Sequence, residues 1–312
     1  MSGRVLRIAT RESQLALWQA NWVASRLKAV DPDQHVELVH VTTTGDRIRD
    51  ASLSTLGGVG VFTREIQQAL LDDRADLAVH SLKDLPTIPV DGLSLAAVPE
   101  RASPWDALIL PAGSHTPELG LEHLSPNAWV GTGSLRRRAQ LLFLRPDLQF
   151  VEIRGNVDTR LRKLDSGEAD ALILAEAGLD RLGLSTRISA RLAPPELFPA
   201  VGQGALGLEC RSDDAATRQI LGQISHAATF ACVTAERHTL ARLGAGCHAP
   251  VGVFTTVENE ELTLEAVALD RDGRQRVHAK RAGPVANPLA IADEVADALC
   301  DQGADDLIAP NR

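Results

Sequence analysis

The sequence predicts an α/β protein made of two similar lobes, followed by a smaller third domain of the α+β class. Short apolar runs alternate with helical segments through most of the chain, a pattern typical of sheets covered by helices. Two strand–turn–helix segments also recur in the same order. I-A-T-R-E-S-Q-L-A-L is echoed by V-G-T-G-S-L-R-R-R, and R-A-D-L-A-V-H is echoed by E-A-D-A-L-I-L. A length of 312 residues supports two or three domains.

The first lobe is expected to open with a strand and a helix in which Leu15, Trp18 and Trp22 fall near one face at helical spacing. The stretch from 43 to 60 is rich in glycine and fits a mobile lid or an ordinary surface loop equally well. The expected elements of this lobe are strands over 4–9, 35–42, 77–79 and 93–98 and helices over 13–30 and 62–73.

The second lobe is expected to begin where the register changes, around residues 99–104. The chain then returns to the first lobe through V-G-Q-G-A-L-G-L-E-C, which we expect to be a strand of small residues. The later elements are expected to be strands at 106–110, 129–131, around 254, 262–269 and 276–280 and helices at 135–145, 213–224, 226–243 and 288–300. The expected domains are therefore residues 1–99 with 203–222, residues 105–198, and residues 226–312.

Composition argues against several classes of function. Aromatic residues make up 3% of the chain, tyrosine is absent and the formal net charge is −9, so no nucleic acid is expected as a partner. The first residues, M-S-G-R-V-L-R-I-A-T-R, are not apolar, so no signal segment is expected. No apolar run approaches the roughly 18 residues of a membrane span, so no membrane is expected either. The four cysteines include no C-x-x-C pair. We therefore expect no metal, no disulfide framework and a cytoplasmic location.

The first candidate site is L-A-V-H-S-L-K-D-L-P, from Leu77 to Pro86. Its apolar start suits a buried strand, and Pro86 rules out a long helix after it. Ligands of open α/β sheets bind outside the carboxyl ends of strands, which makes Lys83 and Asp84 candidates. The alternative is a surface loop with a weak ion pair. In the corresponding turn after the first strand, Ser13 is more simply a helix cap than a ligand.

Basic residues gather in the second lobe, where residues 131–163 include eight basic and three acidic side chains. Guanidinium groups pair with carboxylates and phosphates through two parallel hydrogen bonds, so arginines that follow strand ends indicate a bound polycarboxylate or phosphate. The residues selected in this way are Arg136, Arg137, Arg154 and Arg160. The residues expected to form only solvated helix faces are Arg138, Arg145, Arg162 and Lys163.

Cys247 is the candidate of the third domain, in L-G-A-G-C-H-A-P-V-G. Most free cysteines are small buried hydrophobic residues. A glycine-rich turn offers no packing face, however, and therefore favours an exposed and reactive thiol. A hydrolase with a Cys247–His248 nucleophile is an alternative, but adjacent residues of a turn rarely point at each other.

In this order, the motifs resemble the porphobilinogen deaminase family, also called hydroxymethylbilane synthases. The resemblance rests on V-H-S-L-K-D-L-P, G-S-L-R-R, R-G-N-V-D-T-R, V-G-Q-G-A-L-G-L-E-C and L-G-A-G-C-H-A-P-V-G and covers nearly the whole chain. It implies two lobes like those of periplasmic binding proteins and a third domain with a cysteine on a loop. It also implies a transferase of heme and other tetrapyrrole biosynthesis, which joins four porphobilinogens head to tail with loss of ammonia and releases hydroxymethylbilane by hydrolysis.

The resemblance implies roles for individual residues. Cys247 would carry a dipyrromethane cofactor through a thioether. Asp84 would be the catalytic carboxylate, which can stabilise the cation formed when ammonia leaves. The acetate and propionate groups of the cofactor and growing chain would be held by Arg11, Ser13, Lys83, Thr132, Ser134, Arg136, Arg137, Arg154, Arg160 and Arg181. Porphobilinogen is the expected small-molecule partner, and a monomer is the expected state.

Three positions depart from the family pattern. Gly133 stands where a serine is common, and Thr55 and Val59 stand where lysines are common, which puts one hydroxyl contact and part of the lid's positive charge in question. The main alternative function is an anion-binding receptor built on the same two lobes, without chemistry. The missing signal segment and the cysteine of the third domain count against this receptor.

Overall fold

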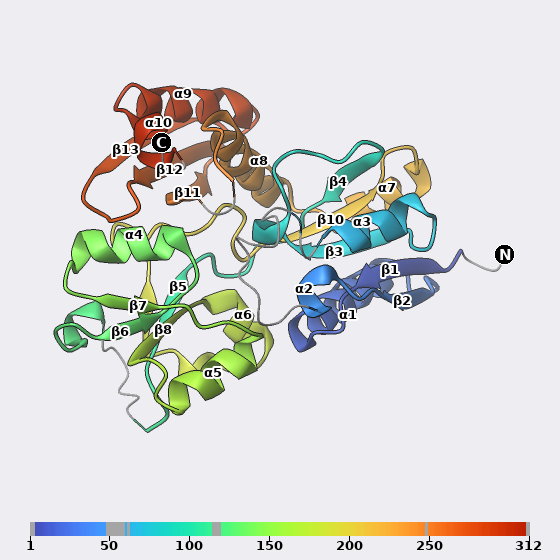
Figure 1. Ribbon diagram of the computed structural model, residues 1–312. Helices are drawn as coiled ribbons and strands as arrows, with labels where there is room; N and C mark the ends of the chain where they lie inside the picture. Colours follow the sequence, from blue (N-terminus) through green and yellow to red (C-terminus); the bar gives the residue numbers. More distant parts are fainter. Residues whose placement is uncertain (1–3, 48–59, 61–62, 114–119, 247–248, 310–312) are drawn as a thin grey trace. The chain divides into compact units, whose positions relative to one another are not determined.

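The chain forms two compact units in the computed structural model, which describes residues 4–47, 60, 63–113, 120–246 and 249–309 (Figure 1). Unit 1 consists of Met1–Ala102 and Ala205–Phe230, and unit 2 consists of Ser103–Gly204 and Ala231–Arg312. The chain therefore leaves unit 1 after residue 102, returns to it after residue 204 and leaves it again after residue 230.

Unit 1 is built on a five-stranded sheet with the order β2-β1-β3-β10-β4. β1 pairs in parallel with β2 and β3, whereas β10 pairs antiparallel with β3 and β4. The strand that lies between β3 and β4 is thus supplied only after the second crossing. The elements are β1 (Leu6–Thr10), α1 (Gln14–Val30), β2 (Val36–His40), α2 (Thr44–Arg47), α3 (Arg64–Leu71), β3 (Leu77–Ser81), β4 (Leu93–Ala97), β10 (Leu206–Arg211) and α7 (Ala215–Gly222).

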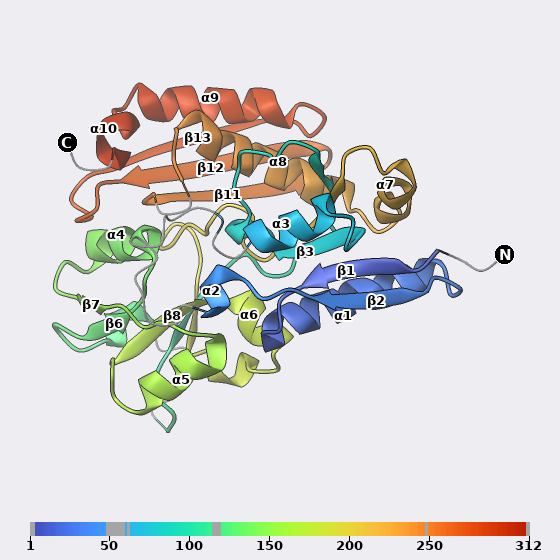
Figure 2. The same ribbon diagram turned by 45° about the vertical axis from the view of Figure 1, so that its right-hand side comes forward.

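The two faces of this sheet are covered by different helices (Figures 1 and 2). Side chains alternate between the faces of a strand, so Leu77 and Val79 pack in the core that includes α1 and α7, and Ala78 packs in the core that includes α3. On α1, Trp18 and Trp22 stack on each other with ring centroids 6.4 Å apart, and Trp18 is 37% exposed. The apolar spacing thus predicted the helix, although its buried face lies to one side of the stacked rings.

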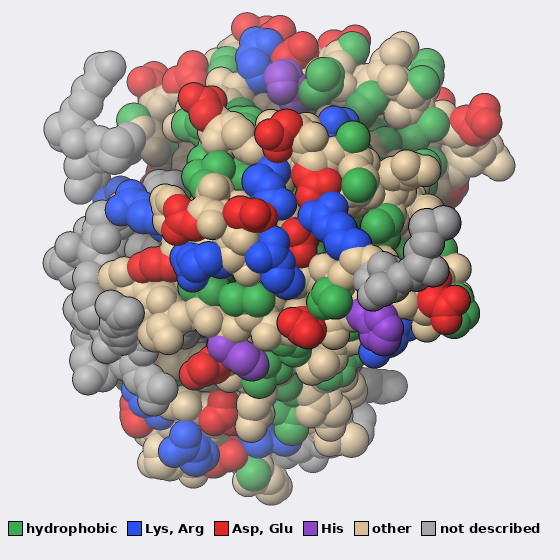
Figure 3. All heavy atoms as spheres, turned by 90° about the vertical axis from the view of Figure 1, so that its right-hand side faces the viewer, with side chains coloured by type: hydrophobic (Ala, Val, Ile, Leu, Met, Phe, Trp, Pro, Cys, Tyr) green, Lys and Arg blue, Asp and Glu red, His purple; other side chains and the backbone are tan. Residues whose placement is uncertain are grey.

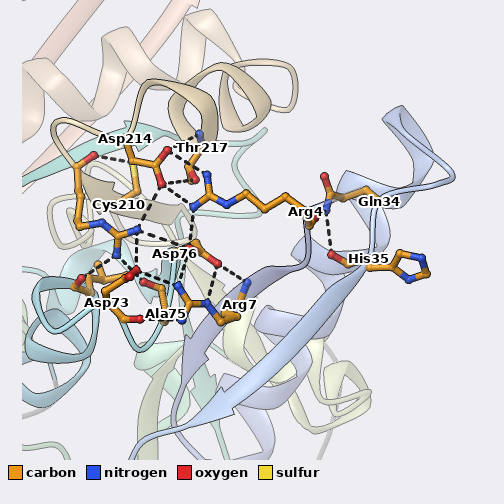
Figure 4. Close-up of polar contacts among 12 residues, drawn as sticks. Arg4, Arg7, Gln34, His35, Asp73, Ala75, Asp76, Cys210, Asp214 and Thr217 are labelled. Carbon is orange, nitrogen blue, oxygen red and sulfur yellow. Dashed lines mark hydrogen bonds and ion pairs between the residues drawn. The ribbon is translucent and has the colours of Figure 1, made fainter. Parts of the chain in front are cut away.

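A network of charged side chains closes the end of the sheet at which β1 and β3 begin (Figure 4). Asp76 precedes β3, and its side chain is 1% exposed. It accepts hydrogen bonds from Arg4 Nη2 at 2.7 Å and Arg7 Nη2 at 2.9 Å. Asp214, before α7, accepts a further hydrogen bond from Arg4 Nη2 at 2.8 Å. Burial opposes ionisation of Asp76, but the hydrogen bonds from Arg7 and Arg4 outweigh it and lower its pKa to about 2.

Acidic and basic side chains are likewise interleaved over the face of the molecule seen in Figure 3. In the Asp76 network, ion pairs connect three separate parts of the chain: the start of β1, the turn before β3 and the turn after β10. The network therefore ties the returning segment to the strands that begin the sheet.

Unit 2 contains a second five-stranded sheet, with the order β7-β6-β8-β5-β9. This is the order of the first sheet, with β6, β7 and β8 in the places of β1, β2 and β3 and with β5 in the place of β10. α4 packs on one face, and α5 and α6 pack on the other. The elements are β5 (Asp106–Ile109), β6 (Trp129–Gly131), α4 (Leu135–Leu144), β7 (Gln149–Val151), α5 (Val157–Asp165), β8 (Ala171–Ala175), α6 (Glu176–Arg181) and β9 (Ala190–Leu192).

A three-stranded antiparallel sheet forms the rest of unit 2. Its apolar core contains residues of all three strands and of the helices that accompany them. The elements are α8 (Ala227–Arg242), whose first four residues belong to unit 1, β11 (Val251–Glu258), β12 (Glu261–Leu269), β13 (Arg276–Pro284), α9 (Pro288–Cys300) and α10 (Ala304–Ile308). The predicted fold class is thereby confirmed as α/β, with two similar lobes whose sheets share one strand order and a small α+β domain. Both sequence echoes are confirmed as well, because each pairs strands in corresponding positions, β1 with β6 and β3 with β8.

The three-stranded sheet packs closely on α4 within unit 2. Gly273, in the β12–β13 turn, has φ +65°, and a Cβ on it would lie 2.3 Å from the carbonyl oxygen of Ala139. The guanidinium of Arg276 lies 5.5 Å from the ring centroid of Phe143 and 5.4 Å from that of Phe198. α4 therefore contributes to two cores, one in the second lobe and one beneath the three-stranded sheet.

Two local expectations are wrong. A one-turn helix, α2, occupies part of the stretch expected to be a loop; most of the rest of that stretch, including Thr55 and Val59, lies outside the described residues. The predicted strand over 201–210 begins only at Leu206, because residues 201–204 form a turn in which Gly202 and Gly204 have φ of +68° and +85°. The boundaries of the three expected domains stay a prediction.

The Asp76 network predicts a pH-dependent contribution to stability. A pKa lowered from 3.8 to about 2 corresponds to about 2 kcal/mol of folding free energy, present above pH 3.8 and lost as the pH falls towards 2. Asp76→Asn should therefore lower the unfolding free energy at pH 7 by at least about 2 kcal/mol. The difference from the parent should narrow between pH 4 and about 2. Urea unfolding of the parent and the variant at pH 7, at pH 4 and near pH 2 measures the difference in unfolding free energy. Asp33→Asn, at an exposed position, is the control. A difference that does not change with pH would contradict the assignment.

Candidate active site

Four predicted site residues lie at one edge of the sheet in unit 1. β1 and β3 run parallel, so their carboxyl ends meet at the same edge. Arg11 and Ser13 follow β1, while Lys83 and Asp84 follow β3. Asp84 is exposed, and the other three are partly buried. The structure thus brings a carboxylate, two cations and a hydroxyl to the edge at which α/β sheets bind ligands.

The turn that carries Asp84 is fixed by contacts on both sides. Leu82 and Asp84 bound a single 3₁₀ turn, as the proline that follows predicted. The backbone N–H of Leu82 donates to the carbonyl oxygen of Ala205 at 3.0 Å, and Gln19 Nε2 donates to Ser81 Oγ at 2.9 Å. The backbone is therefore held by α1 and by the segment that enters β10, while the carboxylate of Asp84 stays exposed to solvent.

Beneath this turn, the sheet buries a polar cluster that the sequence analysis missed. Glu209 on β10 is 4% exposed, and both of its carboxylate oxygens accept hydrogen bonds from Gln67 Nε2 at 3.1 Å. Its Oε2 also lies 3.1 Å from His80 Nε2. On the same strand, Gly207 leaves room for Leu82, since a Cβ there would lie 2.8 Å from Leu82 Cδ1. A charged residue within an apolar strand is the sequence signal that could have revealed the cluster.

The second lobe also carries predicted site residues at the carboxyl ends of its strands. Thr132 and Ser134 lie in the turn between β6 and α4, and Arg154 follows β7. Ser134 Oγ accepts the backbone N–H of Arg137 at 3.4 Å and caps α4. Ser13 caps α1 in the same way, through Ala16 at 3.3 Å, as predicted.

Arg136 and Arg137 are buried against a carboxylate that the sequence analysis did not identify. Their side chains are 5% and 9% exposed, and Asp106 between them is fully buried. Arg136 Nη1 lies 2.8 Å from Asp106 Oδ2, and Arg137 Nη2 lies 2.7 Å from Asp106 Oδ1. Burial opposes ionisation of Asp106, but the two guanidinium charges outweigh it and hold its pKa well below the usual range. The pair predicted to bind an external anion thus already has an internal one.

The remaining candidate arginines contact their own loops. Arg154 pairs with Glu152, and Arg160 Nε donates to the carbonyl oxygen of Gly155 at 2.7 Å. Arg162, expected to be solvated, is indeed 76% exposed. At Gly133, an added Cβ would lie 3.2 Å from a carboxylate oxygen of Glu152, so the Glu152–Arg154 pair lies next to the position that departs from the family pattern.

Two further arginines are held by backbone carbonyls. Arg181, at the end of α6, donates from Nη2 to the carbonyl oxygen of Gly204 at 2.7 Å, where the chain crosses back to unit 1. Burial lowers the pKa of Arg181 to about 10, which leaves it protonated at neutral pH. Arg145 corrects an expectation. It forms two hydrogen bonds with Asp147 and donates to the carbonyl of Leu121 at 2.7 Å, so it is a structural residue and not part of a solvated face.

Cys247 and His248 lie outside the described residues. Within the described ranges, no helix has both the length and the apolar character that a membrane crossing requires.

The fold and the strand-end residues define a two-lobed α/β protein with an exposed carboxylate at one lobe's sheet edge and arginines at the other's. A family model described as porphobilinogen deaminase, dipyromethane cofactor binding domain, matches residues 6–219. A second, described as porphobilinogen deaminase, C-terminal domain, matches residues 230–301. The chain belongs to the porphobilinogen deaminase family. The predicted transferase class, hydroxymethylbilane synthase function in tetrapyrrole synthesis and dipyrromethane cofactor are confirmed.

Relatives cover nearly the full length. The chain is 48% identical to porphobilinogen deaminase of Chromobacterium violaceum over 302 residues. The matched region covers 97% of this chain and 96% of the relative. It is 44% identical over 309 residues to porphobilinogen deaminase of Syntrophotalea carbinolica, which spans 99% and 96%.

Two solved structures are more distantly similar. The periplasmic VFT2 domain of Bordetella pertussis BvgS is 16% identical, with a TM-score of 0.41 over 70% of this chain and 86% of that domain. The alkanesulfonate-binding protein SsuA of Xanthomonas axonopodis pv. citri is 14% identical, with a TM-score of 0.38 over 77% and 75%.

The two carboxylates near the Leu82 turn are predicted to differ in their effect on folding. Glu209→Leu should destabilise the protein by about 3 kcal/mol, because it leaves the buried amide of Gln67 and the imidazole of His80 without their acceptor. Asp84→Asn should change the unfolding free energy by no more than about 0.5 kcal/mol, because Asp84 is exposed. Chemical unfolding of the two purified variants and the parent measures both values. Similar losses for the two variants would show that the Asp84 turn is part of the core.

Proposed function

We propose that this enzyme condenses porphobilinogen by means of Asp84 as its catalytic carboxylate, with the dipyrromethane cofactor attached through a thioether to Cys247. The observation that carries the proposal is the turn of Asp84. Its backbone is anchored through Leu82 and Ser81, while its carboxylate remains exposed at the ligand-binding edge of the sheet. A fixed anion whose position does not change during the reaction is the arrangement that best stabilises a developing positive charge.

The strand-end cations suit a ligand that carries carboxylates. Each pyrrole of the cofactor and of the chain has an acetate and a propionate group, and guanidinium groups bind such anions in a bidentate manner. Arg181 is buried yet protonated at neutral pH, and Arg137 is held in a fixed orientation. These observations support a fit between the residues present and dipyrromethane.

The residues proposed to bind carboxylates lie in both units. Those that would hold carboxylates are Arg11, Ser13 and Lys83 in unit 1 and Thr132, Ser134, Arg136, Arg137, Arg154, Arg160 and Arg181 in unit 2. When bound, the cofactor supplies the pyrrole carbon to which the first substrate is joined. Asp84 contributes the negative charge that favours departure of ammonia from each porphobilinogen, and the arginines orient the carboxylates of the incoming unit.

We extend the proposal to organisation and location. Residues 1–99 with 203–222, residues 105–198 and residues 226–312 would be the three domains. The protein would act in the cytoplasm as a monomer, on a small molecule and without nucleic acid. The net charge of −9 and the absence of a C-x-x-C pair support this view.

Asp84→Asn should lose at least about a hundredfold in turnover, or about 2.7 kcal/mol. A unit charge about 4 Å from a developing cation is worth roughly 4 kcal/mol at an effective dielectric of about 20, and residual water reduces this value. Asp84→Glu, which keeps the charge but displaces it, should retain more activity than Asp84→Asn. The measurement is hydroxymethylbilane formation by variants whose cofactor content has been verified by intact mass. Turnover of loaded Asp84→Asn within tenfold of the parent would remove Asp84 from the mechanism.

Cys247→Ser should lack the mass increment of the cofactor and be inactive, because a hydroxyl is a far poorer nucleophile than a thiolate. It should also unfold at a lower temperature, since a ligand bound only by the native state stabilises that state. Intact mass and thermal unfolding measure the two effects. Cys300→Ser is the matched control and should keep the full increment. An adduct that persists in Cys247→Ser, or disappears in Cys300→Ser, would place the attachment elsewhere. An anion-binding receptor would show no increment in any variant.

A further inference from the structure

The two adjacent arginines at the start of α4 use their guanidinium groups differently. Arg136 Nη1 donates to Asp106 Oδ2 at 2.8 Å and to the carbonyl oxygen of Phe198 at 2.5 Å. Arg137 donates to Asp106 Oδ1 from Nε at 3.0 Å and from Nη2 at 2.7 Å. Within the described ranges, no group accepts a hydrogen bond from Nη1 of Arg137. Because arginine has five N–H donors, Arg137 keeps donors for a ligand although its side chain is 91% buried.

Asp106 is itself held in a fixed position. It is the first residue of β5, which lies between β8 and β9 in the second sheet. Gln203 Nε2 donates to Asp106 Oδ1 at 3.0 Å and to the carbonyl oxygen of Pro104 at 2.7 Å. Oδ1 therefore accepts hydrogen bonds from both Gln203 and Arg137. Because these bonds hold the carboxylate of Asp106 in place, the carboxylate in turn sets the orientation of the Arg137 guanidinium.

The charges of this cluster do not balance. Two guanidinium groups face one carboxylate, which leaves one formal positive charge in excess in a buried place. An uncompensated buried charge is costly, and a helix N-terminus is an unfavourable position for cations. Both arginines lie in the first turn of α4. An anionic ligand at Arg137 would remove both penalties.

We propose that Asp106 is a positioning residue, which orients Arg137 towards a carboxylate of the cofactor or of the growing chain. Arg136 pairs with the other carboxylate oxygen of Asp106 and donates to the carbonyl of Phe198, so it holds Asp106 and the segment around Phe198 in place. This inference rests on the proposed function, and it separates two arginines that the sequence pattern treats alike.

The test compares two buried carboxylates that differ in their relation to the site. Asp106→Asn keeps the shape of the side chain but loses its charge, and should slow acquisition of the dipyrromethane mass increment by at least about tenfold when the protein is incubated with porphobilinogen. Asp76→Asn is the matched control, since Asp76 is equally buried between arginines at the opposite end of β3 from Asp84. It should lose stability but gain the increment at the parent's rate. Intact mass and thermal unfolding measure both properties.

A second pair of variants decides the case if Asp106→Asn does not fold. Arg137→Lys should raise KM by at least about tenfold, with kcat little changed, because an ammonium lacks the fixed fork that pairs with a carboxylate. Arg145→Lys, just after the end of α4, should lower the unfolding temperature with KM near that of the parent, because Arg145 is tied to Asp147 and to the carbonyl of Leu121. The inference is overturned if Asp106→Asn loads at the parent's rate, if Asp76→Asn slows equally, or if the two lysine variants exchange their behaviour. A parent protein that gains no increment and forms no hydroxymethylbilane would instead refute the proposed function, and the inference with it.

Discussion

The antiparallel pairing of β10 with β3 is the contact on which the sheet edge of unit 1 depends. β10 comes from a part of the chain that follows the whole second lobe, yet it lies between β3 and β4. The carbonyl of Ala205, just before it, holds Leu82, its Gly207 makes room for Leu82, and its Glu209 joins two neighbouring side chains in the core. The position of the turn that carries Asp84 is therefore determined by residues more than a hundred positions away in sequence.

Two buried aspartates show how similar clusters serve different ends. Asp76 and Asp106 are both almost fully buried and both pair with two or more arginines. Around Asp76 the opposite charges are well matched, since Asp73 and Asp214 join it against the arginines of its network. Around Asp106 one positive charge remains. A cluster with equal numbers of opposite charges holds strands together. A cluster with an excess positive charge is stabilised further when an external anion binds to it.

Short-range patterns predicted much of the fold and of the candidate site. Strand and helix periods located most elements, the paired echoes predicted two lobes, and the serine of the first strand–turn–helix segment predicted the cap at Ser13. The contacts of Arg136 and Arg137 were not accessible in this way, because Asp106 lies about thirty residues away and only the sheet order brings it near. Arg145 was misjudged for the same reason, since its carbonyl partner at Leu121 comes from a distant loop.

Because Gly273 lies so close to α4, this helix packs both in the second lobe and against the three-stranded sheet. The N-terminal turn of α4 faces the buried carboxylate of the second lobe, while the residues after it, from Ala139 onwards, support the turn of the three-stranded sheet. The C-terminal part of the chain is thus not packed as an independent module, because its sheet rests on a helix of the second lobe. Any replacement would need a turn without a side chain at position 273, where even a methyl group would meet backbone atoms. A side chain introduced into this turn would therefore displace the helix that carries Arg136 and Arg137.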